Sequence, residues 1–232
     1  TITQIKLNRA DLIAESNYDV EKKLLKFKSV KSSINHFDFD YDANIYLEPF
    51  YFDSKIKFEK LNLKNFFKRP ILLEQIIKNF IYENENLNGD INLQINKIEG
   101  NKIFKDIDLK VNLKNKSVSV DKSKINLNSK IGNLTLDRSE FNVINNELIM
   151  RTQVRAEINN QKNFFKLFLI PKNKRKELKN INFYFEFNLT SNEKFVSDPI
   201  FNDSDNIEVF DKSKNIENWI DLKNYVNILF SS

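Results

Sequence analysis

The residue types that usually perform catalysis are scarce in this sequence. It contains one histidine, His36, and no cysteine. A Ser-His-Asp triad needs a histidine base, a thiolate nucleophile needs a cysteine, and structural zinc sites are built from both. His36 is more simply explained as a strand or turn residue beside Phe37. The sequence therefore offers little material for nucleophilic or metal-assisted chemistry.

Acidic residues give no better-defined site. Asp38, Asp40 and Asp42 have the spacing that begins a calcium-binding loop, which also needs glycine at its sixth position and glutamate at its twelfth. Ala43 and Pro49 occupy those positions, so we interpret the aspartates as the solvated face of a strand. No carboxylate pair stands out among the 32 acidic residues, and three separated glycines cannot form a phosphate-binding loop. We therefore predict no enzymatic activity and no cofactor.

The basic residues are spread along the chain. The formal net charge is +5, and lysine alternates with Asp and Glu, whereas nucleic-acid-binding proteins usually concentrate Lys and Arg in one patch. We therefore predict no nucleic-acid partner. A basic cluster over residues 172–179 fits a solvated turn or contact with anionic headgroups. The aromatic segment 181–189 fits core packing, an apolar ligand-binding face or base stacking, in that order of preference.

Alternation of apolar and polar residues recurs along the chain and predicts a mainly β fold. Phe37, Phe39 and Tyr41 alternate with aspartates, and residues 181–189 alternate in the same way. Short strands separated by small turns fill residues 87–150, as in an antiparallel meander whose units contact mainly their neighbours. We expect a long curved antiparallel sheet that forms an open groove or a taco-like shape.

Two segments have the spacing of amphipathic helices instead. Residues 70–82 place apolar side chains three to four positions apart after Pro70, and residues 214–232 repeat this pattern. The stretch 191–213 is rich in Asn, Asp and Ser and predicts a polar loop or linker after a β domain over residues 1–190. No segment approaches the roughly 18–20 apolar residues of a membrane span. Because the chain begins at Thr1 in the middle of the pattern, we expect a piece of a longer polypeptide.

The segment 87–150 resembles the AsmA-like family, which includes the TamB- and YhdP-type bacterial proteins. The pattern LNGDINLQI is followed by FKDIDLKV, by a short return NKSVSV and by a further strand beginning KI. The preceding RPILLEQIIKNF also resembles the helix that leads into this pattern in the family. The resemblance extends over about residues 50–190, although glycine is scarcer here than in the family.

The resemblance implies a non-catalytic protein of the Gram-negative periplasm, tethered to the inner membrane by an anchor outside this segment. Such proteins support outer-membrane lipid homeostasis and are thought to carry phospholipids along an apolar groove. The partners expected here are therefore a phospholipid or another acyl-chain lipid, and the membrane. The residues expected to line the groove are Ile91, Leu93, Ile95, Ile107, Leu109, Val111, Leu113, Val118, Val120, Ile125, Leu127, Leu134, Leu136, Phe183, Phe185 and Phe187.

A second interpretation stays open. The same apolar faces could be fully buried in a structural or interaction domain of the periplasm that binds no ligand. A sheet with one apolar face must cover it with another layer or a ligand. The two interpretations therefore differ in whether that face is closed by the chain itself.

Overall fold

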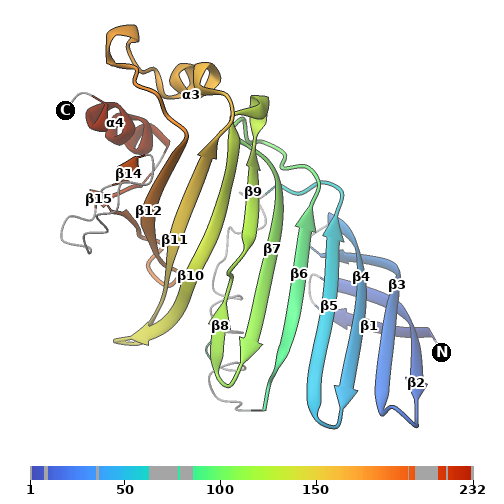
Figure 1. The fold of residues 1–232 in the computed structure, drawn as a ribbon. Helices are drawn as coiled ribbons and strands as arrows, with labels where there is room; N and C mark the ends of the chain where they lie inside the picture. Colours follow the sequence, from blue (N-terminus) through green and yellow to red (C-terminus); the bar gives the residue numbers. More distant parts are fainter. Residues whose placement is uncertain are drawn as a thin grey trace. The chain divides into compact units, whose positions relative to one another are not determined.

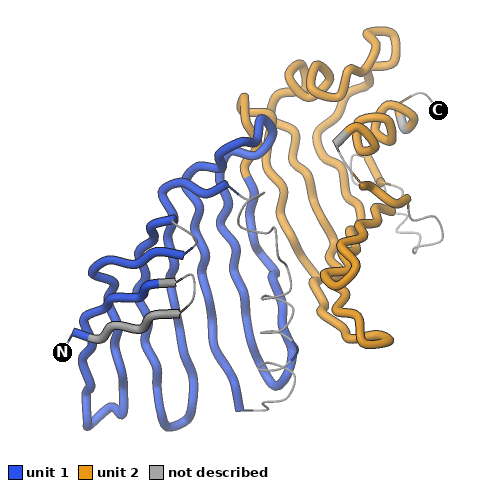
Figure 2. The backbone as a smooth tube through the Cα atoms, turned by 180° about the vertical axis from the view of Figure 1, so that it is seen from behind, with its two compact units in different colours: residues 1–125 blue, residues 126–232 orange. Residues whose placement is uncertain are grey.

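A computed structural model describes the backbone of residues 2–7, 10–34, 37–62, 78, 86–197, 199–201, 214–217 and 219–230. The chain divides into two compact units, residues 1–125 and 126–232 (Figure 2). This division falls inside the single β domain that was expected over residues 1–190. Each strand of a meander contacts mainly the strands beside it, so a boundary can fall in the middle of the pattern.

Unit 1 is a twisted sheet of long strands (Figure 1). The strand order is β1-β2-β3-β4-β5-β6-β7-β9, with β8 paired to β7. Neighbouring strands with an assigned register are antiparallel, except for the parallel pair β5 and β6. The strands are β1 (Ile2–Leu7), β2 (Ala10–Asp19), β3 (Leu24–Ile34), β4 (Phe37–Leu47), β5 (Phe50–Phe58), β6 (Gly89–Ile95), β7 (Phe104–Lys114), β8 (Ser117–Ser119) and β9 (Ser123–Leu127), which the unit boundary crosses.

The alternation in the sequence explains these strands. In β4, Phe37, Phe39 and Tyr41 are half-buried, while the intervening aspartates are exposed. Successive side chains of a strand point to opposite faces, so such a sequence gives one apolar and one polar face. Asn115 and Lys116 form the turn between β7 and β8, with φ angles of 49° and 64°. These left-handed values are those of a two-residue hairpin turn.

Unit 2 combines antiparallel strands with two helices. The strand order is β10-β11-β12-β13-β15, and β14 also pairs with β12. Its elements are β10 (Gly132–Ile144), β11 (Glu147–Ile158), α3 (Gln161–Phe168), β12 (Asn180–Asn188), β13 (Lys194–Val196), β14 (Ile200–Phe201), β15 (Lys214–Asn215) and α4 (Trp219–Leu229). Short 3-10 turns lie at Asn128–Lys130 and Lys172–Lys174.

Helix α3 was not predicted from the sequence. The side chain of Asn160 accepts a hydrogen bond from the backbone N–H of Asn163 at 3.0 Å and so caps its first turn. The helix ends at Leu169, whose φ of 59° is left-handed. Its eight residues bury Phe164, Phe165 and Phe168. The cap and the spacing of these phenylalanines are the sequence signals that could have identified it.

The predicted fold class is confirmed: the chain is mainly β, with long antiparallel strands in open, curved sheets. The C-terminal helix is present as α4. The helix expected over residues 70–82 lies outside the described residues, apart from Lys78. The loop expected over residues 191–213 is corrected in part, because β13 and β14 lie within it as short strands that extend the sheet beyond β12.

Each unit has its own apolar core. In unit 1, Phe58, Leu61, Ile95 and Ile98 form a buried cluster where β5 and β6 end. An isolated parallel bridge joins Leu61 to Ile98 and continues the pairing of β5 with β6. In unit 2, a buried cluster consists of Val196, Ile216 and Tyr225.

Candidate functional site

The register of unit 1 aligns apolar side chains in rows that cross several strands. Residues directly opposite each other in a sheet point to the same face, so each row lies on one side. One row holds Phe58, Ile95 and Ile107, and the ring of Phe39 stacks on that of Phe58 at 5.2 Å between centroids. The next row holds Tyr41, Ile56, Leu93 and Leu109, and a third holds Ala43, Ser54, Ile91 and Val111. We call these residues the unit 1 apolar face. It extends over β4, β5, β6 and β7.

Burial is uneven across this face. Phe58 and Ile95 are each only 3% exposed and belong to the buried core. The side chains of Leu93, Leu109 and Val111 are half-buried. The face is therefore closed at Phe58 and Ile95 in the first row and partly accessible along the second and third rows.

Several residues that were expected to line a groove lie in the interior. Leu113 and Val118 are opposite each other on β7 and β8, and both are 3% exposed. Val120 and Leu127 are also buried, whereas Ile125 is half-buried. With Ile95, these buried positions contribute to the core of the chain rather than to an accessible surface.

The second set of predicted residues forms a comparable face in unit 2. One row holds Leu134, Ala156 and Ile181; the next holds Leu136, Val154 and Phe183; further along lie Thr152, Phe185 and Val196, and then Phe141, Met150 and Phe187. We call these residues the unit 2 apolar face. Leu134, Leu136, Phe183, Phe185 and Phe187 are half-buried, as are Phe141 and Met150.

Helix α4 covers part of the unit 2 apolar face. Phe183, Phe185 and Leu222 pack against the buried cluster that contains Tyr225. The Tyr225 hydroxyl donates a hydrogen bond to the carbonyl oxygen of Ser197 at 3.0 Å, which fixes the helix to the sheet. Phe187 lies outside this cluster, although its ring centroid is 6.3 Å from that of Phe185.

An aromatic cluster that sequence reasoning missed joins α3 to α4. The ring of Phe230 lies 5.8 Å from that of Phe165 and 5.3 Å from that of Phe201, centroid to centroid, both edge-on. The Asn227 side-chain amide donates to the carbonyl oxygen of Phe168 at 2.6 Å. The two helices are thus held together by ring contacts and a hydrogen bond.

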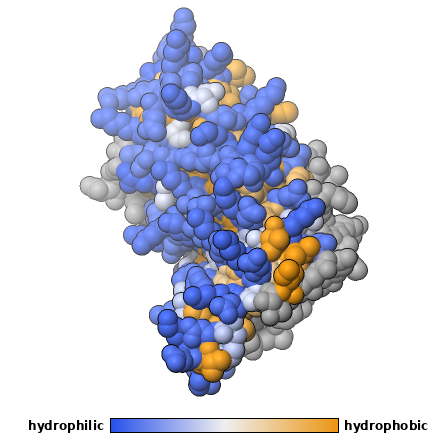
Figure 3. All heavy atoms as spheres, turned by 90° about the vertical axis from the view of Figure 1, so that its right-hand side faces the viewer, coloured by the Kyte–Doolittle hydropathy of each residue, from blue (hydrophilic) through white to orange (hydrophobic). Residues whose placement is uncertain are grey.

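The opposite face of unit 1 is polar. Glu15, Lys28, Asp42 and Lys55 form a row of alternating charge across β2, β3, β4 and β5. Hydrophilic side chains dominate the surface seen in Figure 3, with hydrophobic ones in small groups. This arrangement suits a solvated sheet surface, because opposite charges on facing strands attract.

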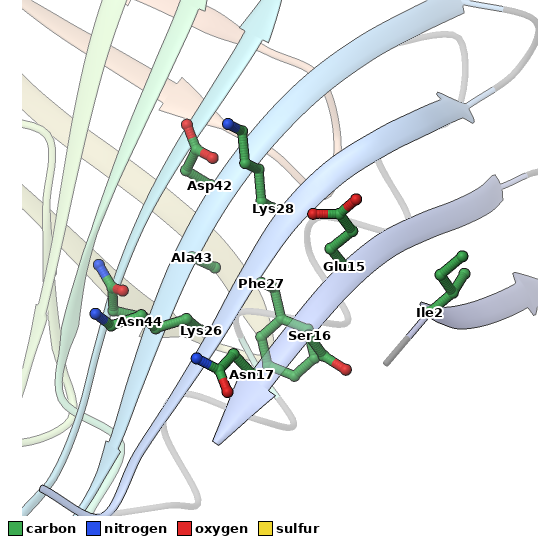
Figure 4. Close-up of a pocket in the computed structure, with 10 residues that line it drawn as sticks. All are labelled: Ile2, Glu15, Ser16, Asn17, Lys26, Phe27, Lys28, Asp42, Ala43 and Asn44. Atoms are coloured by element: carbon green, nitrogen blue, oxygen red, sulfur yellow. The ribbon is translucent and has the colours of Figure 1, made fainter. Parts of the chain in front are cut away.

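A cavity of about 580 Å³ lies along this row in unit 1. In Figure 4, Lys28 stands beside Asp42, and Lys26 extends toward Asn44. Its lining residues are Ile2, Glu15, Ser16, Asn17, Lys26, Phe27, Lys28, Asp42, Ala43 and Asn44. Its charged residues alternate in sign rather than converging on one point, and no group of three or more metal-ligating side chains occurs among the described residues.

A hydrogen-bonded network links β5, β6 and β7 on the polar face. The Tyr51 hydroxyl donates to the Asp90 carboxylate, which also accepts from the Asn112 amide at 2.7 Å. The hydrogen bond to Asp90 raises the pKa of Tyr51 to about 12, and desolvation adds to this effect. The hydrogen bonds from Tyr51 and Asn112 lower the pKa of Asp90.

This network predicts alkaline sensitivity. Because the folded-state pKa of Tyr51 exceeds its ordinary value of 10.0, its contribution to stability is complete below about pH 10 and lost as the pH rises toward 12. NMR titration of ¹³C-labelled tyrosine should show Tyr51 ionising near pH 12, and Asp90→Asn should return it toward 10. A Tyr51 resonance that titrates near 10 in the unaltered chain would contradict this assignment.

Among the residues that the structure describes, no helix combines the length and apolar character needed to cross a bilayer. Comparison of the chain with protein-family models, with curated proteins and with solved structures found no match. The functional interpretation therefore depends on the geometry of the two apolar faces and on the residue patterns of the sequence.

Proposed function

We propose that the chain is a segment of an AsmA-like envelope protein that binds or conducts phospholipid acyl chains along apolar sheet faces, without catalysis. In this proposal it works in the periplasm of a Gram-negative bacterium and supports outer-membrane lipid homeostasis. An inner-membrane anchor would lie elsewhere in a longer polypeptide. The residue patterns of segment 87–150 support the family assignment, and the apolar faces support the ligand class.

The observation that carries the proposal is the half-buried part of the unit 1 apolar face. Ile56, Leu93 and Leu109 form one row, and Ile91 is opposite Val111 in the next. All of these side chains remain partly exposed. An acyl chain laid on these rows would remove both its own methylenes and the side chains from water.

The energetics favour a ligand that is held by many similar contacts. Burying a methylene stabilises a complex by roughly 0.8 kcal/mol, and neighbouring rows offer similar aliphatic side chains. No single position on such a surface fixes the register of an acyl chain. Binding would therefore tolerate different chain lengths and allow movement along the face.

A structural domain without a ligand is the second candidate. The specific observation in its favour is the packing of Phe183 and Phe185 against the cluster that contains Tyr225. There, the chain covers its own apolar face with α4. If the unit 1 apolar face were also inaccessible to lipid in solution, this second candidate would be preferred.

Photo-crosslinking distinguishes the two candidates. A benzophenone amino acid at position 109 would lie on the unit 1 apolar face, and one at position 110 would lie on the opposite face of the same strand. With vesicles of phosphatidylethanolamine and phosphatidylglycerol, we expect lipid adducts from position 109 and few from position 110. Equal labelling at both positions, or none at either, would favour the structural domain.

A further inference from the structure

Two lysines stand on the unit 2 apolar face where β13 and β15 form its margin. Lys194 is directly opposite Phe187, and Lys214 is directly opposite Val196. Val196 in turn is opposite Phe185, so both lysines belong to the side of the sheet that carries the phenylalanines. They are diagonal neighbours on adjacent antiparallel strands, a relation that places residues about 7–8 Å apart.

Each ammonium group lies over an aromatic ring. The Nζ atom of Lys194 is 5.1 Å from the ring centroid of Phe187, and that of Lys214 is 5.4 Å from the ring centroid of Tyr225. These cation–π contacts place both positive charges beside apolar side chains. Lys194 is half-buried there, whereas Lys214 is exposed at the outer strand.

Lys194 is held in this place by two hydrogen bonds to Asn192. Its Nζ donates to the backbone carbonyl oxygen of Asn192 at 2.8 Å and to the side-chain oxygen of Asn192 at 3.0 Å. The adjacent carboxylate of Glu193 accepts a hydrogen bond from the Ser191 hydroxyl instead. Among the described residues, neither Lys194 nor Lys214 forms an ion pair with a carboxylate.

Partial burial of Lys194 disfavours its charged form. Desolvation lowers the pKa of its ammonium group. An anion placed against this group would restore the lost stabilisation of the charged form. Lysine is a compact point charge and is well suited to phosphate oxygens.

We infer that Lys194 and Lys214 anchor the phosphate headgroup of an anionic phospholipid whose acyl chain lies along Phe187, Met150 and Phe141. This inference rests on the proposed function and adds a preference among lipid headgroups to it. Two cations that form no ion pair within the described part of the chain favour a phosphodiester of net negative charge. A choline or ethanolamine headgroup would bring a third cation to the same place.

The test uses the full chain and two ligands with the same palmitoyl chain. Calorimetric titration below the critical micelle concentration compares lysophosphatidylglycerol with lysophosphatidylcholine. A basic residue near an anionic lipid surface contributes a factor of about five in affinity, so the two lysines together predict about a 25-fold preference for the glycerol lipid. Glycerol 3-phosphate, which has the phosphate but no acyl chain, should not bind measurably.

Matched variants assign the preference to these residues. Lys194→Gln with Lys214→Gln should abolish the preference by weakening the binding of lysophosphatidylglycerol to about that of lysophosphatidylcholine. Lys162→Gln with Lys166→Gln removes the same charge from the exposed side of α3 in unit 2 and should keep the preference. Lys194→Arg with Lys214→Arg should also keep the preference for lysophosphatidylglycerol. That result would show that the sheet margin tolerates substitution.

The possible outcomes separate this inference from the proposed function. Equal binding of both lysolipids, or a preference that survives the double glutamine variant, overturns the headgroup anchor while acyl-chain binding stands. Binding of glycerol 3-phosphate as tight as that of the lipid shows a free-phosphate site instead and also overturns it. Failure of both lysolipids to bind removes the proposed function itself.

Discussion

Replacing Gly132 by alanine should strongly destabilise the β10–β11 pair. A Cβ atom at this position would lie 1.8 Å from the carbonyl oxygen of Glu157 and 2.9 Å from its carbonyl carbon. These are backbone atoms of the facing strand, where Gly132 is opposite Ile158. Relief requires that one strand move, because no side chain can rotate away. We expect a loss of about 3 kcal/mol or more in the free energy of unfolding, the upper end for overpacking.

Hydrogen exchange of the β10 and β11 amides provides the local readout, together with chemical denaturation. Gly100→Ala is the matched control, since the nearest atom there is the flexible Asn62 side-chain nitrogen at 3.2 Å. Its φ of 71° adds a left-handed penalty of about 1–2 kcal/mol for a residue with a Cβ. If Gly132→Ala lowered the free energy of unfolding no more than Gly100→Ala, the close approach of β10 to β11 at Gly132 would be contradicted.

The second large effect concerns ligand binding. Leu109→Glu places a carboxylate in the middle of the unit 1 apolar face, opposite Leu93. Burial of a leucine side chain is worth about 1.5–3 kcal/mol, and a carboxylate against an acyl chain adds a desolvation cost. We expect a loss of at least about tenfold in affinity for a phospholipid. Leu93→Glu should have the same effect from the neighbouring strand.

The control for this change is on the same strand. Lys110→Gln alters the net charge by the same amount but lies on the polar face. It should leave lipid affinity within a factor of about two, as expected for a surface substitution away from the binding face. Far-ultraviolet circular dichroism of all variants establishes that the sheet is retained. Equal losses from Leu109→Glu and Lys110→Gln would show that net charge, rather than the apolar face, determines binding.

The strands were the most predictable part of this chain. The alternation of Phe37, Phe39 and Tyr41 with aspartates gave the burial pattern of β4. The small turns expected between the strands of residues 87–150 include the one at Asn115 and Lys116. Strand alternation is a local property, because each residue's face follows from its position along the strand.

Features that depend on distant pairing could not be read in the same way. The parallel alignment of β5 with β6 depends on how residues 59–88 return the chain, and alternation is the same for parallel and antiparallel neighbours. Helix α3 is short, and its phenylalanines also suit a strand. Strand β13 occupies only Lys194–Val196 within a polar stretch.

The sequence could predict which side of the sheet a residue of the candidate site lies on, but not how exposed that residue is. Leu93 and Leu109 were both expected on the groove face, and the register makes them direct neighbours. It could not distinguish Leu109, which is half-buried, from Leu113, which is 3% exposed. That difference depends on what packs above each position, which is a tertiary property. The aromatic contacts of Lys194 and Lys214 required the structure for the same reason.

Native mass spectrometry after incubation with phospholipid tests the central claim most directly. The unaltered chain and Lys110→Gln should both carry adducts of phospholipid mass, whereas Leu109→Glu should carry few or none. A folded, unaltered chain that carries no lipid at any concentration below the critical micelle concentration would contradict the claim that its apolar faces bind acyl chains.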